Sequence, residues 1–208
     1  KILGIAGNKK KSILYKFLEE ERNNAEGFLP QYFEMGFGQF GNSKEGNTEE
    51  FFIADVKVRG KIDRVDVNPA NKTFKVIDYK LSGKKPTKAD LETGLSLQLP
   101  LYLYASKKLI EIELNGEFDP SAAIIYSLKL SNKDFGKKNI HISSSRTPSE
   151  DDLLRSNEEL IKICSEFIPA YVEQITSGKF NLSMIEDRQN KVCRFCDFKS
   201  ICRIQDVI

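Results

Sequence analysis

Two strand-like runs joined by a turn constrain this chain more than any other feature of its sequence. The runs at 59–66 and 74–81 flank a short segment that is rich in Asn and Pro. Turn residues between two such runs predict a β-hairpin. Side chains two residues apart on a strand point to the same face, so Asp78 and Lys80 project together. The hairpin would bring Asp63 of the first run beside them.

Two carboxylates and a lysine that meet at the end of a sheet form a candidate metal site. Carboxylate oxygens are the hard ligands that Mg²⁺ and Mn²⁺ prefer, and such sites keep several waters. A metal-bound water is more acidic than bulk water, and a nearby ammonium offsets negative charge in a phosphodiester transition state. The whole arrangement therefore indicates phosphodiester hydrolysis, although Asp78-Tyr79-Lys80 taken alone is more typical of solvated charges on a surface strand.

The composition is that of a globular protein. The 208 residues fit one domain, alone or with a small appendage, and a hydrophobic fraction of 40% permits a core. The sequence has no apolar run of about 18 residues and no signal-peptide pattern, so we expect a cytoplasmic protein that does not associate with a membrane. Because the chain begins with Lys1 rather than Met, we interpret it as a segment of a longer protein or a processed product.

The lysines cluster although the net charge is only +2. Lys84, Lys85 and Lys88 follow the second strand-like run and are candidate contacts for the phosphates of DNA. A solubilising surface explains such a group as well, and we prefer that explanation for the lysines at 9–11.

Hydrophobic periodicity predicts the other elements. Strands are expected at 31–38, 51–67, 73–81 and 121–130, with a short strand at 139–142 and a bend near Gly60. Helices are expected at 10–26, 95–111 and 149–177. Pro100 belongs near the first turn of the second helix, and Ser149 with Asp152 approaches a capping arrangement at the start of the third.

Three motifs in this order and at these spacings resemble the RecB-type branch of the PD-(D/E)XK nuclease superfamily. The resemblance extends over roughly residues 28–204. The motifs are Gly60-x-x-Asp63-Arg64-x-Asp66, Asp78-Tyr79-Lys80 and Gln98-x-x-x-Tyr102.

The resemblance implies a role for each motif residue. Asp63 and Asp78 would bind a catalytic Mg²⁺ or Mn²⁺, and the backbone carbonyl of Tyr79 would add a ligand. Lys80 would position the attacking water. In the same family, the residues that correspond to Gln98 and Tyr102 lie on a helix that flanks the site and orient the lysine or the DNA backbone.

The resemblance also implies an α/β fold, the αβββαβ core with a mixed central sheet flanked by helices. We expect a nuclease domain at 1–180 and a C-terminal tail at 181–208 that packs on the same domain. RecB-type nucleases often carry a metal-binding histidine on the first helix, but residues 10–26 contain none. Glu34 on the first expected strand is our candidate for completing the metal shell.

The tail carries Cys193, Cys196 and Cys202 at the spacing C-x₂-C-x₅-C. Thiolates separated by two intervening residues can bind one metal ion or cluster, so the spacing allows zinc, an iron–sulfur cluster or three unligated thiols. The tail is similar to that of iron–sulfur nucleases of the RecB type, among them AddB-type helicase–nuclease subunits and CRISPR adaptation nucleases. That similarity implies a [4Fe–4S] cluster whose fourth cysteine lies upstream of the core.

This chain departs from that cysteine pattern. No cysteine precedes Asp63, and the remaining one, Cys164, lies in the third expected helix. There we expect a buried small apolar residue rather than a ligand. The fourth ligand would then lie in a missing upstream region, or zinc would replace the cluster.

We therefore expect a metal-dependent DNA exonuclease or endonuclease, the nuclease domain of a helicase–nuclease in double-strand-break repair and recombination. Its expected partners are single-stranded DNA and a helicase subunit or domain of the same complex. The first alternative is a stand-alone or CRISPR-associated RecB-like exonuclease. A non-catalytic DNA-binding module of the same fold is the second, and a zinc-binding structural domain is the third.

Overall fold

The computed structural model describes residues 12–22, 27–38, 50–81, 85–130, 134–179, 190, 192–197 and 201. The chain forms two compact units, Lys1–Pro169 and Ala170–Ile208. The first unit contains the sheet and the core. Whether residues 181–208 pack on the nuclease domain stays a prediction.

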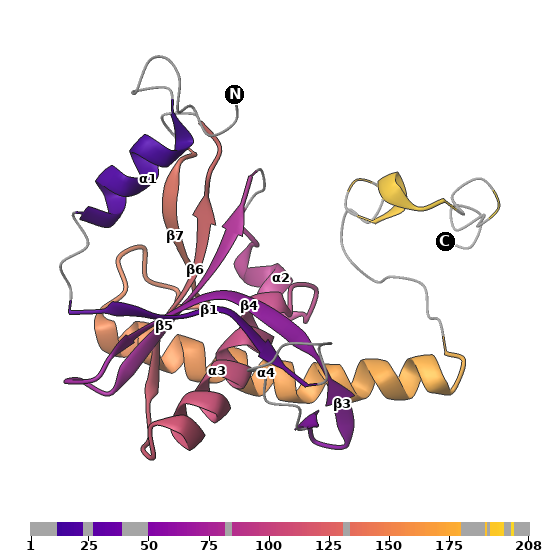
Figure 1. The fold of residues 1–208 in the computed structure, drawn as a ribbon. Coiled ribbons are helices and arrows are strands. Elements are labelled where there is room, and N and C mark those ends of the chain that lie inside the picture. The colour runs from indigo at the N-terminus through magenta and orange to yellow at the C-terminus, as the bar shows by residue number, and fades with distance from the viewer. Residues whose placement is uncertain are drawn as a thin grey trace. The chain divides into compact units, whose positions relative to one another are not determined.

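A mixed sheet lies at the centre of the first unit (Figure 1). Its strand order is β1-β4-β5-β6-β7, in which β5 and β6 run parallel and the other neighbours antiparallel. The five strands are β1 (Leu29–Phe37), β4 (Gly60–Asn68), β5 (Thr73–Lys80), β6 (Asp119–Ser127) and β7 (Gly136–Ile140). The hairpin predicted from the turn residues is confirmed as the antiparallel pair β4–β5.

Four α-helices accompany the strands in the described part of the chain, and their starts follow local chemistry. They are α1 (Ile13–Arg22), α2 (Lys88–Glu92), α3 (Gln98–Glu113) and α4 (Glu150–Thr176). Pro100 falls in the first turn of α3, where the missing N–H costs nothing. Ser149 and Asp152 form the expected reciprocal cap of α4, since each backbone N–H donates to the other side chain at 3.1–3.2 Å.

Residues 51–67 form three strands rather than the single bent strand that we expected. β2 (Phe51–Ile53) and β3 (Val56–Val58) pair with each other in a separate small hairpin. Ala54 between them has a positive φ of 50°, which reverses the chain where the apolar pattern alone continues. The helix α2 was also missed, because its five residues are too few for a periodic signal.

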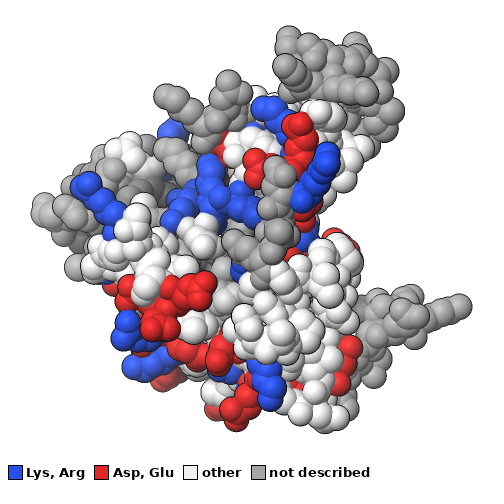
Figure 2. Space-filling model, turned by 90° about the vertical axis from the view of Figure 1, so that its left-hand side faces the viewer, with Lys and Arg blue, Asp and Glu red and all other residues white. Residues whose placement is uncertain are grey.

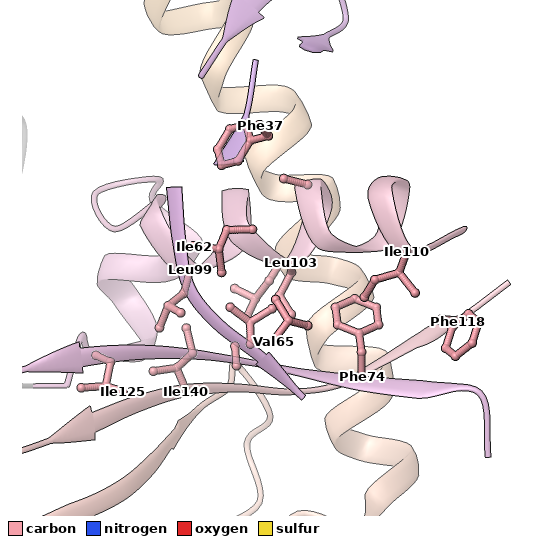
Figure 3. Packing of buried hydrophobic residues seen from close by; sticks show 14 of the residues in the cluster. Phe37, Ile62, Val65, Phe74, Leu99, Leu103, Ile110, Phe118, Ile125 and Ile140 are labelled. Atoms are coloured by element: carbon pink, nitrogen blue, oxygen red, sulfur yellow. The ribbon is translucent and has the colours of Figure 1, made fainter. Parts of the chain in front are cut away.

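The main core lies between the sheet and α3 (Figure 3). Val65 of β4, Phe74 of β5 and Leu103 of α3 are fully buried in this cluster. A smaller cluster on the opposite face of the sheet contains Ile77 and Tyr126, against which Phe17 of α1 packs. Helices therefore cover both faces, and the expected mixed sheet flanked by helices is confirmed.

None of the described helices is long and apolar enough to span a bilayer. Cys164 of α4 has no exposed surface and belongs to the core, as we expected. Burial raises the pKa of its thiol to about 12, which disfavours the thiolate that a metal would need.

Candidate active site

The site forms where β4 and β5 separate. The two strands pair from Asn68 and Thr73 up to Arg64 and Ile77, and the pairing stops there. Beyond that point the Asp63 carboxylate replaces the missing strand partner, because its Oδ2 accepts a hydrogen bond of 2.9 Å from the backbone N–H of Tyr79. One predicted metal ligand is thereby held at the strand that carries the other.

Asp78 and Lys80 lie on the face of β5 that also carries Phe74 and Val76 of the main core. Asp78 is only 2% exposed. The Lys80 Nζ lies 3.2 Å from Oδ1 of Asp78 and 2.9 Å from Oδ2. The two side chains that were expected to project together therefore meet as a half-buried ion pair.

Gln98, the first residue of α3, links these two side chains. Its Nε2 donates to Oδ1 of Asp78 at 3.0 Å, and its Oε1 accepts from Lys80 Nζ at 3.1 Å. The same Nε2 donates to the hydroxyl of Tyr102 at 3.1 Å, one helical turn further along α3. The structure thus joins four of the five predicted catalytic side chains by direct contacts, and Asp63 is tied to the same strand through the backbone N–H of Tyr79.

The electrostatics of Asp78 follow from its position. Burial raises the pKa of its carboxyl above the ordinary value of 3.8, and the nearby Asp63 raises that pKa further, while Lys80 opposes both. A cation placed between the two carboxylates would relieve this repulsion. Perturbed carboxyl groups of this kind are frequent at functional sites.

The residues present fit a divalent cation. Oδ2 of Asp78 is buried and accepts no hydrogen bond from the described residues, since the Lys80 ammonium lies close to it but outside hydrogen-bonding geometry. Within the described residues, no three or more His, Cys, Asp or Glu side chains group as a metal site. Two carboxylates and the Tyr79 carbonyl would supply oxygen donors and leave other positions to water, which is the kind of environment that Mg²⁺ favours.

Glu34, the candidate for completing the metal shell, is not brought into this group. The register of β1 against β4 places it opposite Asp63. Its φ is +52°, however, and its exposed carboxylate pairs with Lys61 at 2.6 Å. A metal-binding role for Glu34 stays a prediction.

Two of the three candidate DNA-binding lysines, Lys85 and Lys88, lie in the described part of the chain, and Lys88 is the first residue of α2. Lys84 falls outside the described residues. Lys85 is exposed, although partial burial of its ammonium lowers its pKa. Lys88 Nζ donates to Ser144 Oγ at 3.1 Å and lies 3.5 Å from Glu92. Their contact with DNA stays a prediction.

Two cysteines of the tail lie in the described part of the second unit. Cys193 begins the 3₁₀ turn Cys193–Phe195, and the N–H of Cys196 closes this turn on the carbonyl of Cys193 at 3.3 Å. Cys202 lies outside the described residues. Zinc or iron–sulfur ligation by the three cysteines stays a prediction.

The sequence analysis assigned no role to Arg64 and Asp66, although both residues belong to the first motif. Both side chains point away from the core cluster and form an ion pair in which 3% and 1% of the side chains are exposed. The alternation of side chains along β4 could have predicted that Arg64 and Asp66 share the other face of the sheet, because Val65 and Val67 face the core.

The molecular surface carries charges of both signs. Figure 2 shows Lys and Arg gathered in the upper half of one face, while Asp and Glu alternate with them below. This distribution agrees with the net charge of only +2. A basic surface that binds a nucleic acid would therefore cover only part of the molecule.

The comparisons with known proteins agree with the geometry of the site. The family model of the PD-(D/E)XK nuclease superfamily matches residues 6–203. An ATP-dependent helicase/deoxyribonuclease subunit of Oceanobacillus iheyensis is 25% identical, over 92% of this chain and 21% of that protein. The protein of the same name from Bacillus subtilis is 23% identical, over 89% of this chain and 20% of its own length.

A further protein of that name, from Lactobacillus gasseri, is 38% identical over 41% of this chain and 8% of its own length. The chain spans about a fifth of the length of the first two relatives. The expected resemblance is confirmed by these matches. Because the family model covers nearly the whole sequence, the chain belongs to the PD-(D/E)XK nuclease superfamily.

Proposed function

We propose that this chain is a metal-dependent DNA nuclease domain, part of a helicase–nuclease that acts in double-strand-break repair and recombination. One observation carries the proposal. Asp63, Asp78 and Lys80 converge where β4 and β5 separate, and the buried Oδ2 of Asp78 accepts no hydrogen bond from the described residues. A structural or purely DNA-binding role would not require this convergence.

The carboxylates of Asp63 and Asp78 and the carbonyl of Tyr79 would hold Mg²⁺ or Mn²⁺. Nucleases of this superfamily generally use divalent metals. When bound, the ion would supply positive charge that stabilises the phosphodiester transition state and would make nearby water more acidic.

Lys80 would position the water that attacks phosphorus, and its ammonium would offset the charge that develops on the phosphate oxygens. The attack forms a bond between the water oxygen and phosphorus and breaks the bond from phosphorus to the leaving deoxyribose oxygen; the attacking water loses a proton to solvent, and the leaving oxygen takes one up. Gln98 would limit the rotation of the flexible lysine, since its Oε1 accepts from Nζ at 3.1 Å. Tyr102 would in turn orient the Gln98 amide.

The substrate and partner are inferred from the relatives, whose name combines a helicase and a deoxyribonuclease. We infer that single-stranded DNA, delivered by a helicase subunit or domain, is cut at this site. Lys84, Lys85 and Lys88 would contact its phosphates as point charges. Cys193, Cys196 and Cys202 would ligate a [4Fe–4S] cluster with a fourth ligand from outside this chain, or zinc in its place.

The test is cleavage of end-labelled single-stranded DNA in Mg²⁺, in Mn²⁺ and in EDTA, for the wild-type chain and for Lys80→Ala. Lys162→Ala is the matched control, because Lys162 is an exposed lysine of α4 that pairs only loosely with Glu159, at 3.9 Å. We expect cleavage that EDTA abolishes, a loss of at least about 100-fold in Lys80→Ala, and no change in Lys162→Ala.

Two results would contradict the proposal in different ways. Metal-dependent cleavage that is unchanged in Lys80→Ala would show that the chemistry occurs elsewhere. DNA binding without any cleavage by the wild-type chain would favour a non-catalytic DNA-binding module of this fold.

A further inference from the structure

Two consecutive residues of β4 hold the same residue of β5 from opposite faces of the sheet. Asp63 accepts the backbone N–H of Tyr79 at 2.9 Å on the face of the candidate site. Arg64 donates from Nη1 to the Tyr79 hydroxyl at 3.1 Å on the other face. Tyr79 is therefore fixed at its backbone and at the tip of its side chain.

The guanidinium of Arg64 is itself held rigidly. Its Nε and Nη2 donate to the two carboxylate oxygens of Asp66 at 2.5 and 2.7 Å, a bidentate pair. Nη2 also lies 2.7 Å from Oε2 of Glu21 in α1. Burial lowers the pKa of Arg64, but the hydrogen bonds to Asp66, Tyr79 and Glu21 outweigh it and raise that pKa above its ordinary value.

The same cluster connects elements that are far apart in the sequence. Glu21 pairs through Oε1 with Lys137 of β7 at 2.8 Å. The rings of Tyr79, Phe17 and Tyr126 pack against one another, with ring centroids 5.3 to 6.0 Å apart. A movement of the Tyr79 ring would therefore disturb α1, β4 and β6 together.

We propose that Arg64 and the Tyr79 hydroxyl are positioning residues for the metal site on the opposite face of the sheet. The inference rests on the proposed function, since it assumes that Asp63 and the Tyr79 carbonyl bind the cation. Anchoring the Tyr79 side chain restricts the rotation of its peptide groups, and these contribute both the N–H that orients Asp63 and the carbonyl that would bind the cation. Partners behind metal ligands commonly change metal affinity by about 10–100-fold when they are removed.

The test is a direct titration of the full chain with Mn²⁺ in the absence of DNA. Binding is measured by calorimetry and by the electron paramagnetic resonance signal of free Mn²⁺. Tyr79→Phe removes the hydroxyl and keeps the ring. Tyr126→Phe is the matched control: Tyr126 is the parallel neighbour of Tyr79 on β6, is fully buried, and its hydroxyl has no hydrogen-bond partner among the described residues. Circular dichroism at the titration temperature verifies that every variant is folded.

We expect Tyr79→Phe to weaken Mn²⁺ binding about 10-fold, and Tyr126→Phe to bind as the wild-type chain does. A merely structural role of the hydroxyl would lower the melting temperature and leave the affinity of the folded protein unchanged, and that result would overturn the inference. Equal weakening in both variants would overturn it too, because the effect would then come from the aromatic cluster. If the wild-type chain itself bound no Mn²⁺, the proposed metal site would fail, and this inference with it.

Discussion

The Nε2 of Gln98 lies 3.0 Å from Oδ1 of Asp78, so the first residue of α3 holds the buried carboxylate at the end of β5. Its Oε1 simultaneously accepts from the ammonium of Lys80. An amide can donate to an anion and accept from a cation at once, whereas a carboxylate or an ammonium in its place could not. The helix start thus sets the geometry of the ion pair.

Replacing Gln98 with Ala should lower the DNA cleavage rate about 10–100-fold, because hydrogen bonds to charged groups contribute about 1.5–3 kcal/mol. Tyr102→Phe removes only the hydroxyl that Gln98 contacts, so its effect should be smaller. Single-turnover cleavage at saturating DNA measures both. A larger loss in Tyr102→Phe than in Gln98→Ala would mean that the hydroxyl acts on the substrate instead of orienting the amide.

The stability of the chain without metal should depend on pH through Asp78. Burial and Asp63 raise the pKa of its carboxyl above 3.8, so the folded state binds this proton more tightly than the unfolded state. The stabilisation is fully present below pH 3.8, the ordinary value, and is lost as the pH rises through the raised pKa. Urea unfolding in EDTA, compared between wild type and Asp78→Asn, checks the sign. Relative to the variant, the wild type should lose stability as the pH rises above 3.8 and through the raised pKa, and a gain would contradict the assignment.

Gly60 at the start of β4 should tolerate no side chain. A Cβ there would lie 2.3 Å from Cζ of Phe37, whose ring is buried in the core. Gly60→Ala should therefore destabilise the fold by about 1–3 kcal/mol, as overpacking does. Gly36→Ala on the neighbouring strand is the control, because nothing lies within 4 Å of the added carbon. Thermal melts that shift equally for both variants would show that strand propensity, not the Phe37 contact, is the cause.

The cysteines of the tail should bind a metal, whereas Cys164 in the core should not. Cys196→Ser should reduce the iron or zinc content of the purified chain and destabilise the tail, with less effect on cleavage. Cys164→Ala should leave the metal content unchanged, since Cys164 is fully buried in the core. Elemental analysis together with absorption spectroscopy measures the content. Wild-type protein without iron and zinc would contradict a structural metal site in the tail.

Much of the site could be predicted from the sequence because most of its residues lie close together in the chain, on one hairpin or on one helix. Asp78 and Lys80 share a face by strand alternation, and the Asn- and Pro-containing turn places Asp63 on the adjacent strand. The motif residues Gln98 and Tyr102 are four residues apart on one helix, so they are neighbours by helical geometry alone.

Other features depended on neighbours that no local pattern reveals. The reversal between β2 and β3 occurs at Ala54, which has a positive φ, and helix α2 is too short to produce a periodic signal. Glu34 was chosen because it lies on the first expected strand, but its carboxylate pairs with Lys61 and its backbone has a φ of +52°.

The sequence by itself determined most strands of the main sheet, the three longer helices and the motif residues, since periodicity and spacing are properties of the chain over a few residues. Only the tertiary structure decided which atoms meet. The separation of β4 and β5 lets Asp63 accept from Tyr79, and the packing of α1 on the far face places Glu21 against Arg64. These contacts join residues far apart in the chain, so their geometry depends on how the sheet and helices pack rather than on any one segment.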